Sequence, residues 1–349
     1  MISVNRARGA IVGSAVLAAI VCLMAILVSN VGGSTDAQVF ITFGINLVFA
    51  LGVQTFMGSA GIVSFGHMAF AAIGAFAAGL LTTPVAIKLS SIPDAPTFIV
   101  NASLGFIPAT LVAMGIAALV ALVVGIPLMR LHGTEAGIAT YALLVIVQVV
   151  LLNVDTVTRG AQTFYGLPKE TGIWAAAIFA MVALFAARLV RESDSGLSVR
   201  ATQGSALAAE SSGVRTTRSR MVVWVASAMV MALGGSLYAH FVTAFSPNNF
   251  GLTLTFTVLT MIVLGGQSIF GAFVGASLVT ALTEFLRRSV TTLSIGVFSI
   301  EGAFLTPILL GVITIGILML RPQGLADRSE PEKLPGLIKR TRLFDRFSS

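Results

Sequence analysis

Few residues of this chain have the type and spacing that catalysis requires. The three histidines, His67, His132 and His240, are not spaced as metal ligands, and the single cysteine, Cys22, also argues against a zinc site. The chain has no Gly-x-x-x-x-Gly-Lys-Ser/Thr loop for ATP and no Gly-x-Ser-x-Gly nucleophile elbow. The sequence therefore predicts no enzyme activity, no metal and no cofactor. Any ATP would have to be hydrolysed by another subunit.

The acidic residues lie near the ends of apolar runs rather than within them. Glu284, for example, can pair with Arg287 or Arg288 one helical turn further on. Carriers driven by protons or ions usually hold ionisable groups deep in the bilayer, where a charge costs about 2.5 to 3.5 kcal/mol and is kept only for function. The absence of such residues indicates that the energy for any transport comes from outside the chain.

The longest polar interruption of the apolar sequence is the loop 191–220. At its centre we expect a short helix at 206–212, capped by Ser205 and ended by Gly213, which suits a left-handed turn. Two small alanines would let this helix lie in a groove of another protein, and one glutamate would supply a charged hydrogen-bond acceptor. The alternative is a solvated loop without a partner. The candidates for contact with a soluble partner are Arg200, Ala208, Ala209, Glu210 and Gly213.

Polar side chains on or beside the apolar runs are candidates for lining a passage between helices. The stretch 58–66 is rich in Gly and Ser and separates two apolar runs, which is typical of an unwound segment with free backbone groups. Buried Asn, Gln and His side chains also often bond a neighbouring helix, so a structural role remains an alternative for each. The pathway candidates are Asn46, Gln54, Ser64, His67 and Tyr141.

These side chains must be positioned by helices that cross a membrane. Hydrophobic residues make up 56% of the 349 residues and charged residues 10%. The mean hydropathy is +0.97, which a soluble domain could not carry without large exposed apolar patches. The apolar runs are continuous and lack the alternation of membrane strands. We therefore predict an all-α polytopic membrane protein with about ten spans of suitable length, at residues 10–29, 38–58, 65–83, 101–128, 136–153, 172–190, 221–244, 252–265, 270–287 and 302–320.

The basic residues indicate how these helices are oriented. With an even number of crossings both termini share one side, and most of the 21 Lys and Arg residues then fall in the termini and in the loop 191–220. The positive-inside rule places that side in the cytoplasm. The net charge of +7 does not indicate nucleic acid, because these residues form no stripe on a soluble domain. We expect a transmembrane domain at 1–325 and a cytoplasmic tail at 326–349.

Short segments in a fixed order cover most of residues 40–325. Within the polar loop they are Gly196–Ala201, Ala208–Glu210 and Gly213-Val214. Outside the loop they include Gly58–Phe70, Leu237–His240, Ser246-Pro247, Val263–Gly266, Gly275-Ala276 and Arg321–Leu325. Together these segments resemble the LivM-type permeases of branched-chain amino acid ABC importers. The chain departs from that pattern at Gln203, Gly204 and Ala206, where the family often carries charged residues before its Ala-Ala-Glu.

The resemblance implies an ABC importer permease fold in which the loop 191–220 contains a cytoplasmic coupling helix. It also implies a second, LivH-like permease, two ABC ATPase subunits and a periplasmic substrate-binding protein as partners, assembled in the lipid bilayer of a bacterial inner membrane. The cargo expected from the family is leucine, isoleucine or valine, with urea, amides or another small solute as alternatives. From the residues alone, a stand-alone secondary carrier or channel also remains open.

Overall fold

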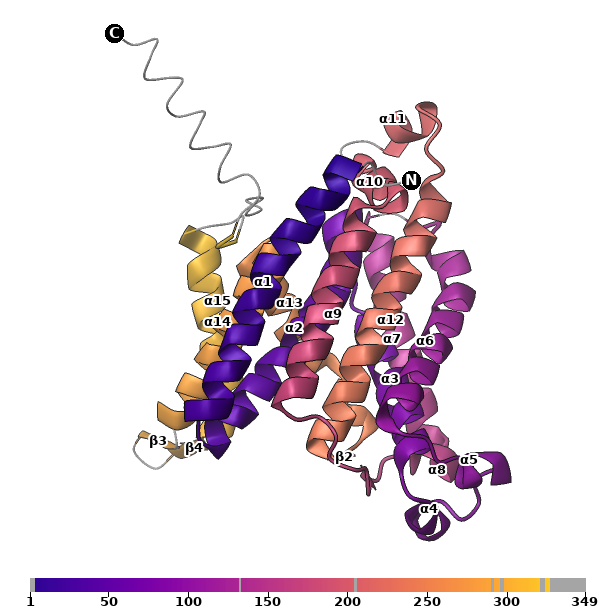
Figure 1. Cartoon of the computed structure of the whole chain (residues 1–349), viewed down its shortest axis with the longest axis vertical. Helices are drawn as coiled ribbons and strands as arrows, with labels where there is room; N and C mark the ends of the chain where they lie inside the picture. Colours follow the sequence, from indigo (N-terminus) through magenta and orange to yellow (C-terminus); the bar gives the residue numbers. More distant parts are fainter. Residues whose placement is uncertain are drawn as a thin grey trace.

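The computed structural model describes residues 4–131, 133–203, 206–289, 292–295, 298–320 and 324–326. Figure 1 shows a bundle of long helices that run side by side, with short elements gathered at the two ends. The short helices α10 and α11 lie at one end, which we call the loop end, and α4, α5 and α8 lie at the opposite end, which we call the far end. The all-α class predicted from the sequence is confirmed.

The long helices are α1 (Val4–Val31), α2 (Ser34–Ala60), α3 (His67–Thr82), α6 (Phe106–Leu128), α7 (Gly133–Asn153), α9 (Ile173–Glu192), α12 (Thr216–Val242), α13 (Leu252–Gly265), α14 (Ile269–Ser289) and α15 (Gly302–Leu320). The short helices are α4 (Val85–Ser91), α5 (Thr97–Asn101), α8 (Asp155–Thr158), α10 (Asp194–Ala201), α11 (Ala206–Ser211) and the 3-10 turn η1 (Pro247–Phe250). Two antiparallel strand pairs complete the described chain: β1 (Phe164–Tyr165) with β2 (Ala244–Phe245), and β3 (Thr292–Ile295) with β4 (Phe298–Glu301).

The long helices coincide with the apolar runs of the sequence. Within the described residues, 8 helices are long and apolar enough to cross a membrane, or up to 9 if α3 and α4, which are bent by 115°, form one broken span. The predicted number of ten crossings stays a prediction. Several helices extend into the polar flanks: α12 begins at Thr216 rather than at residue 221. The short run at 252–265 is lengthened by η1, and together they cover Pro247–Gly265.

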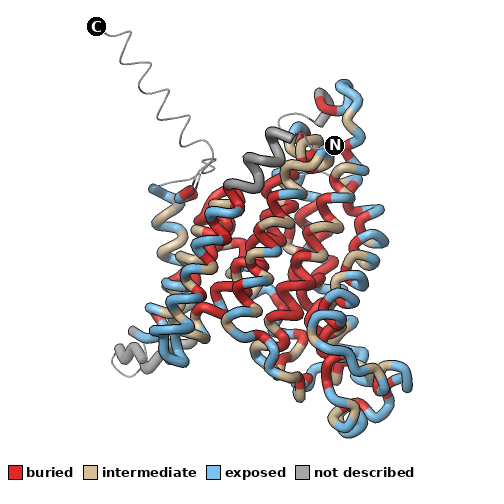
Figure 2. Tube along the Cα trace, viewed as in Figure 1, coloured by how far each residue is buried: buried red, intermediate tan, exposed pale blue. Residues whose placement is uncertain are grey.

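The core is centred on α12, which packs against α2, α3 and α6 in the middle of the bundle (Figure 2). Glycines let α3 and α12 approach closely, because a Cβ added to Gly235 would lie 1.9 Å from the carbonyl oxygen of Ala71. The same addition at Gly74 would lie 2.3 Å from the carbonyl oxygen of Ala232. In lipid, association of helices depends on such close packing rather than on the hydrophobic effect.

Helix α6 shows how one sequence supplies both a packed face and a lipid-facing face. Its alanines recur at every fourth position and are buried: Ala109, Ala113, Ala117 and Ala121. Large apolar side chains occupy the other faces, and Leu119 is 64% exposed. Exposed apolar side chains of this size are expected on a helix surrounded by hydrocarbon. The protein is a multi-pass membrane protein.

The far end is organised by one buried cation. Helix α3 ends before Thr83-Pro84, where proline disfavours a helical conformation of the preceding residue. Lys88 of α4 is fully buried, and its Nζ donates to the carbonyl oxygens of Leu80 and Ile99, each at 3.0 Å, and to that of Ala102. The ammonium group therefore holds α4 and α5 against the end of α3.

The loop end is closed by residues that follow the last long helix. The backbone N–H groups of Leu325 and Ala326 donate to the carbonyl oxygens of Leu264 at 2.7 Å and Gly265 at 3.0 Å. These carbonyls belong to the last turn of α13, where helical partners are missing. Helix α1 also begins at this end of the bundle (Figure 1). The first long helix therefore begins at the same end at which the described chain finishes, as an even number of crossings requires.

Candidate functional site

A polar pocket of about 350 Å³ opens between α2, α12, α13 and α14. Its α2 wall carries polar side chains three or four residues apart, which places them on one helix face: Thr35, Gln38, Thr42 and Asn46. Gln38 and Thr42 are exposed, although α2 is otherwise one of the most buried helices of the bundle. Polar groups turned outward on a membrane-spanning helix require water or another polypeptide beside them.

The opposite wall is formed by α14, whose polar residues repeat with the same helical spacing: Thr280, Thr283, Glu284 and Arg287. The two walls are joined where the Asn46 amide Nδ2 donates to the Thr280 hydroxyl at 2.9 Å. Thr257 of α13 adds a further hydroxyl. The pocket therefore offers many neutral hydrogen-bonding groups and few charges.

The charged residues of the pocket lie toward the far end of the bundle. The Glu284 carboxylate accepts two hydrogen bonds of 2.8 Å from the guanidinium of Arg287 and one of 2.5 Å from Nε of Arg288. Arg288 also lies 3.6 Å from the Asp36 carboxylate in the first turn of α2. The pairing of Glu284 predicted from the sequence is confirmed, and the network ties the start of α2 to the end of α14.

A second candidate surface is the loop 191–220 at the loop end (Figure 1). The short helix predicted there is present as α11, and Gly213 has a left-handed φ of 83° just beyond it. The Gly213 N–H donates to the Glu210 carbonyl oxygen at 2.9 Å. The Glu210 side chain accepts from the Thr216 hydroxyl at 2.8 Å, so it ties α11 to the start of α12.

The remaining candidates of this loop have different surroundings. Arg200 of α10 lies 3.7 Å from Glu192 and donates to the Arg191 carbonyl oxygen at 3.2 Å, which fastens α10 to the end of α9. Ala209 is buried. The side chain of Ala208 and residue Ser205 lie outside the described residues. The loop is thus a pair of short helices attached at both ends to long helices of the bundle.

Comparison with known families shows to which class of protein the chain belongs. The model of the family described as branched-chain amino acid transport system, permease component, matches residues 36–320. The chain belongs to this family. Two relatives are high-affinity branched-chain amino acid transport system permease proteins LivM. That of Salmonella typhimurium is 24% identical over 89% of this permease and 75% of the relative. That of Escherichia coli is also 24% identical, over 82% and 69% respectively. No solved structure matches the chain.

The permease brings only one predicted pathway residue to the polar pocket, namely Asn46. His67 is buried, with Nδ1 2.8 Å from the Ser64 hydroxyl and Nε2 3.1 Å from the Ser227 hydroxyl. Aromatic rings of Phe56 and Trp224 pack against its imidazole. His67, which is also bonded to Ser64, therefore joins α3 to α12 through Ser227, and this is the structural alternative that the sequence left open.

Gln54 and Tyr141 also lie away from the polar pocket of the permease. Gln54 is buried in α2, one turn before Gly58. Tyr141 is 39% exposed on the outer face of α7. In the described residues no group of three His, Cys, Asp or Glu side chains could hold a metal ion.

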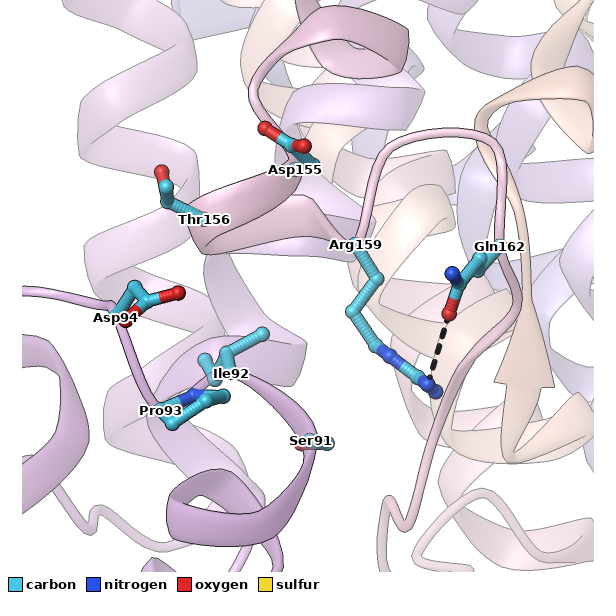
Figure 3. A pocket seen from close by; sticks show the side chains of 8 residues that line it. All are labelled: Ser91, Ile92, Pro93, Asp94, Asp155, Thr156, Arg159 and Gln162. Carbon is cyan, nitrogen blue, oxygen red and sulfur yellow. Dashed lines mark hydrogen bonds between the residues drawn. The ribbon is translucent and has the colours of Figure 1, made fainter.

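A smaller pocket of about 190 Å³ lies at the far end of the permease, between the turn after α4 and the segment that contains α8 (Figure 3). Asp94, Asp155, Arg159 and Gln162 line it, and Arg159 donates to the Gln162 side chain at 3.1 Å. The Arg159 guanidinium also stacks over the Tyr165 ring, 4.5 Å from its centroid. Two segments that lie far apart in the sequence therefore form one polar surface at the far end.

Sequence reasoning missed most of the pocket residues of the permease, although a signal was present. The α2 residues at 35, 38, 42 and 46 recur at helical spacing, as do 280, 283, 284 and 287 on α14. A search for polar faces rather than for single polar residues would have found both walls.

Proposed function

We propose that this chain is the permease subunit of an ATP-driven ABC importer that moves small solutes, branched-chain amino acids foremost, from a periplasmic binding protein into the cytoplasm. The observation that carries the proposal is a polar pocket between two membrane-spanning helices, formed by a face of α2 that is exposed at Gln38 and Thr42 and by polar residues of α14. Such a face is unfavourable in hydrocarbon and suits one wall of a water-filled pathway. The opposite wall would come from a second, LivH-like permease.

The loop end supplies the contact with the motor. The chain contains no P-loop, so ATP would be hydrolysed by two ABC ATPase subunits that grip α10 and α11. The basic residues of this loop and of both termini support, by the positive-inside rule, an orientation in which the loop end faces the cytoplasm, and the proposed membrane is a bacterial inner membrane. The polar pocket of the far end, around Asp94 and Arg159, would then meet the periplasmic binding protein.

The chemistry of the pocket supports a zwitterionic cargo. Neutral hydroxyl and amide groups line its depth, and its charges, Glu284 and Arg287, already neutralise each other at the far end. A lining without unpaired charge would let an amino acid pass without a tight site that slows its release. The LivM relatives are named for branched-chain amino acid transport. Urea, amides and other small solutes fit the same neutral lining and are the alternative cargo.

A reconstituted system tests the proposal. The chain, its second permease, the ATPases and the binding protein are placed in proteoliposomes, and uptake of labelled leucine is measured with ATP, without ATP and without the ATPases. Uptake should require ATP and every subunit. Leucine flux through the two permeases alone, at the rate of the full complex, would instead support a stand-alone carrier or channel.

The turn after α11 provides a separate prediction. Gly213→Pro is expected to lower ATP-dependent uptake while the chain stays in the membrane, because proline requires a φ near −65° and Gly213 has a φ of 83°. Glu210→Arg should do the same, because it removes the acceptor of the Thr216 hydroxyl. Uptake and membrane content are measured together.

Two milder variants serve as controls for this turn. Gly213→Asn should retain most uptake, since asparagine tolerates the left-handed region and, among the described residues beyond its chain neighbours, none comes within 4 Å of its Cβ. Glu210→Gln keeps an oxygen for Thr216 and should be less harmful than Glu210→Arg. Normal uptake by both harmful variants would show that the turn does not transmit force.

A further inference from the structure

The end of α2 is held by a side chain from the polar loop. Gln203 lies two residues beyond α10, and its Nε2 donates to the carbonyl oxygens of Gly58 at 3.1 Å and Ser59 at 2.9 Å. Both carbonyls belong to the last turn of α2, where no helical N–H is available. One amide therefore caps two orphan acceptors of a helix that is remote in the sequence.

A glycine at the end of α2 leaves room for the Gln203 side chain. The helix ends at Gly61, which has a left-handed φ of 67°. A Cβ at Gly61 would lie 3.2 Å from Cγ of Gln203, closer than an ordinary contact. Glycine at this position thus permits the left-handed turn and also leaves space for the aliphatic carbons of the glutamine side chain.

The loop can move this amide only together with α10. Val199 of α10 is fully buried, and Thr202, beside Gln203, is 6% exposed and donates to the Val199 carbonyl oxygen. Arg200 fastens the same helix to the end of α9. A displacement of α10 would therefore carry Gln203 with it rather than being absorbed by a loose linker.

The same end of α2 contains a buried side-chain amide that lacks hydrogen bonds among the described residues. Gln54, one turn before Gly58, is 2% exposed, and neither its Nε2 nor its Oε1 has a hydrogen-bond partner among the described residues. A Cβ at Gly58 would lie 2.3 Å from the Gln54 Nε2, so the amide lies directly against the glycine. An unpaired buried amide disfavours the present arrangement. A rearrangement of α2 at Gly58–Gly61 could provide Gln54 with a partner.

We infer that Gln203 is a positioning residue that transmits movement of the polar loop to the cytoplasmic end of α2, the helix that forms one wall of the polar pocket. This inference rests on the proposed function. In this mechanism, binding of the ATPases displaces α10. The hydrogen bonds from Gln203 then pull on the Gly58 and Ser59 carbonyl groups, and α2 shifts relative to α14. The Gln203 side chain would thus connect the loop 191–220, which contacts the ATPases, to the helix that lines the pathway.

The experiment measures transport and ATP hydrolysis on the same proteoliposomes of the complete complex. Gln203→Ala removes both hydrogen bonds, and Gln203→Glu keeps the size of the side chain but presents oxygens to the two carbonyls. Both variants should lower the leucine transported per ATP hydrolysed by about tenfold, a ratio within the usual range of coupling between sites. Hydrolysis stimulated by the binding protein should remain close to that of the unmodified complex.

Gln267→Ala is the matched control, because it removes an exposed glutamine side chain at the break between α13 and α14. It should leave the ratio unchanged. A normal ratio in both Gln203 variants would overturn the inference while the ATP-dependent flux of the unmodified complex still supported the proposed function. Failure of both Gln203 variants to assemble, with normal assembly of Gln267→Ala, would also overturn it and show a purely structural contact. Absence of ATP-dependent flux in the unmodified complex would instead refute the proposed function itself.

Discussion

Gly235→Ala is expected to prevent stable assembly of the bundle. The added methyl group would lie 1.9 Å from the Ala71 carbonyl oxygen, so α3 and α12 would have to move apart along their whole contact. Overpacking of a core typically costs about 1 to 3 kcal/mol, and here the obstacle is backbone rather than a flexible side chain. The protein should accumulate poorly in membranes and unfold at a markedly lower temperature in detergent.

Gly115→Ala on α6 is the matched control for this substitution. Apart from its own helix, no described part of the chain comes within 4 Å of a Cβ at Gly115, and alanine stabilises a helix interior by roughly 0.5 to 1 kcal/mol relative to glycine. Its melting temperature should be equal to or above that of the unmodified protein. Equal stability of the two variants would mean that the close contact between α3 and α12 is not required.

Much of this fold is readable from composition and periodicity. Continuous apolar runs predict the long helices, because only a helix satisfies its own backbone in hydrocarbon. The stop before Pro84 and the break at Gly265-Gly266 are also marked by their residues. The short helices α4 and α5 were not predicted, because they depend on hydrogen bonds from Lys88 to carbonyl groups 8, 11 and 14 residues away, which local residue preferences do not reveal.

The candidate site was predicted less completely. Asn46 was identified, but Ser64 and His67 proved to be bonded inside the bundle. A polar side chain on an apolar helix can line a pathway or join two helices, and the sequence does not determine which way each helix is turned. The contact of Gln203 with α2 could not be predicted either, since it spans more than a hundred residues.

We expect water to reach the polar pocket, and a cysteine placed in it should show this. After Cys22→Ser removes the single natural thiol, Thr42→Cys should react with a membrane-impermeant thiol reagent, because its position lines the pocket and is exposed. Leu122 on α6 is also exposed in the isolated chain, at 49%, but a cysteine at this position should be protected by lipid. Thiols react as thiolates, which form readily in water and poorly in hydrocarbon.

Filling the pocket should then stop transport without unfolding the protein. Thr42→Trp places a large ring in a cavity of about 350 Å³ from a position that is not part of the core, so folding and membrane content should be retained. Leucine uptake by the reconstituted complex should fall about tenfold or more, because passage depends on the free width of the path. Leu119→Trp, on the lipid-facing side of α6, should transport normally. If Thr42→Trp transported as well as Leu119→Trp, and if the thiol of Thr42→Cys were protected, the face of α2 would be a helix-packing surface and the pathway would lie elsewhere.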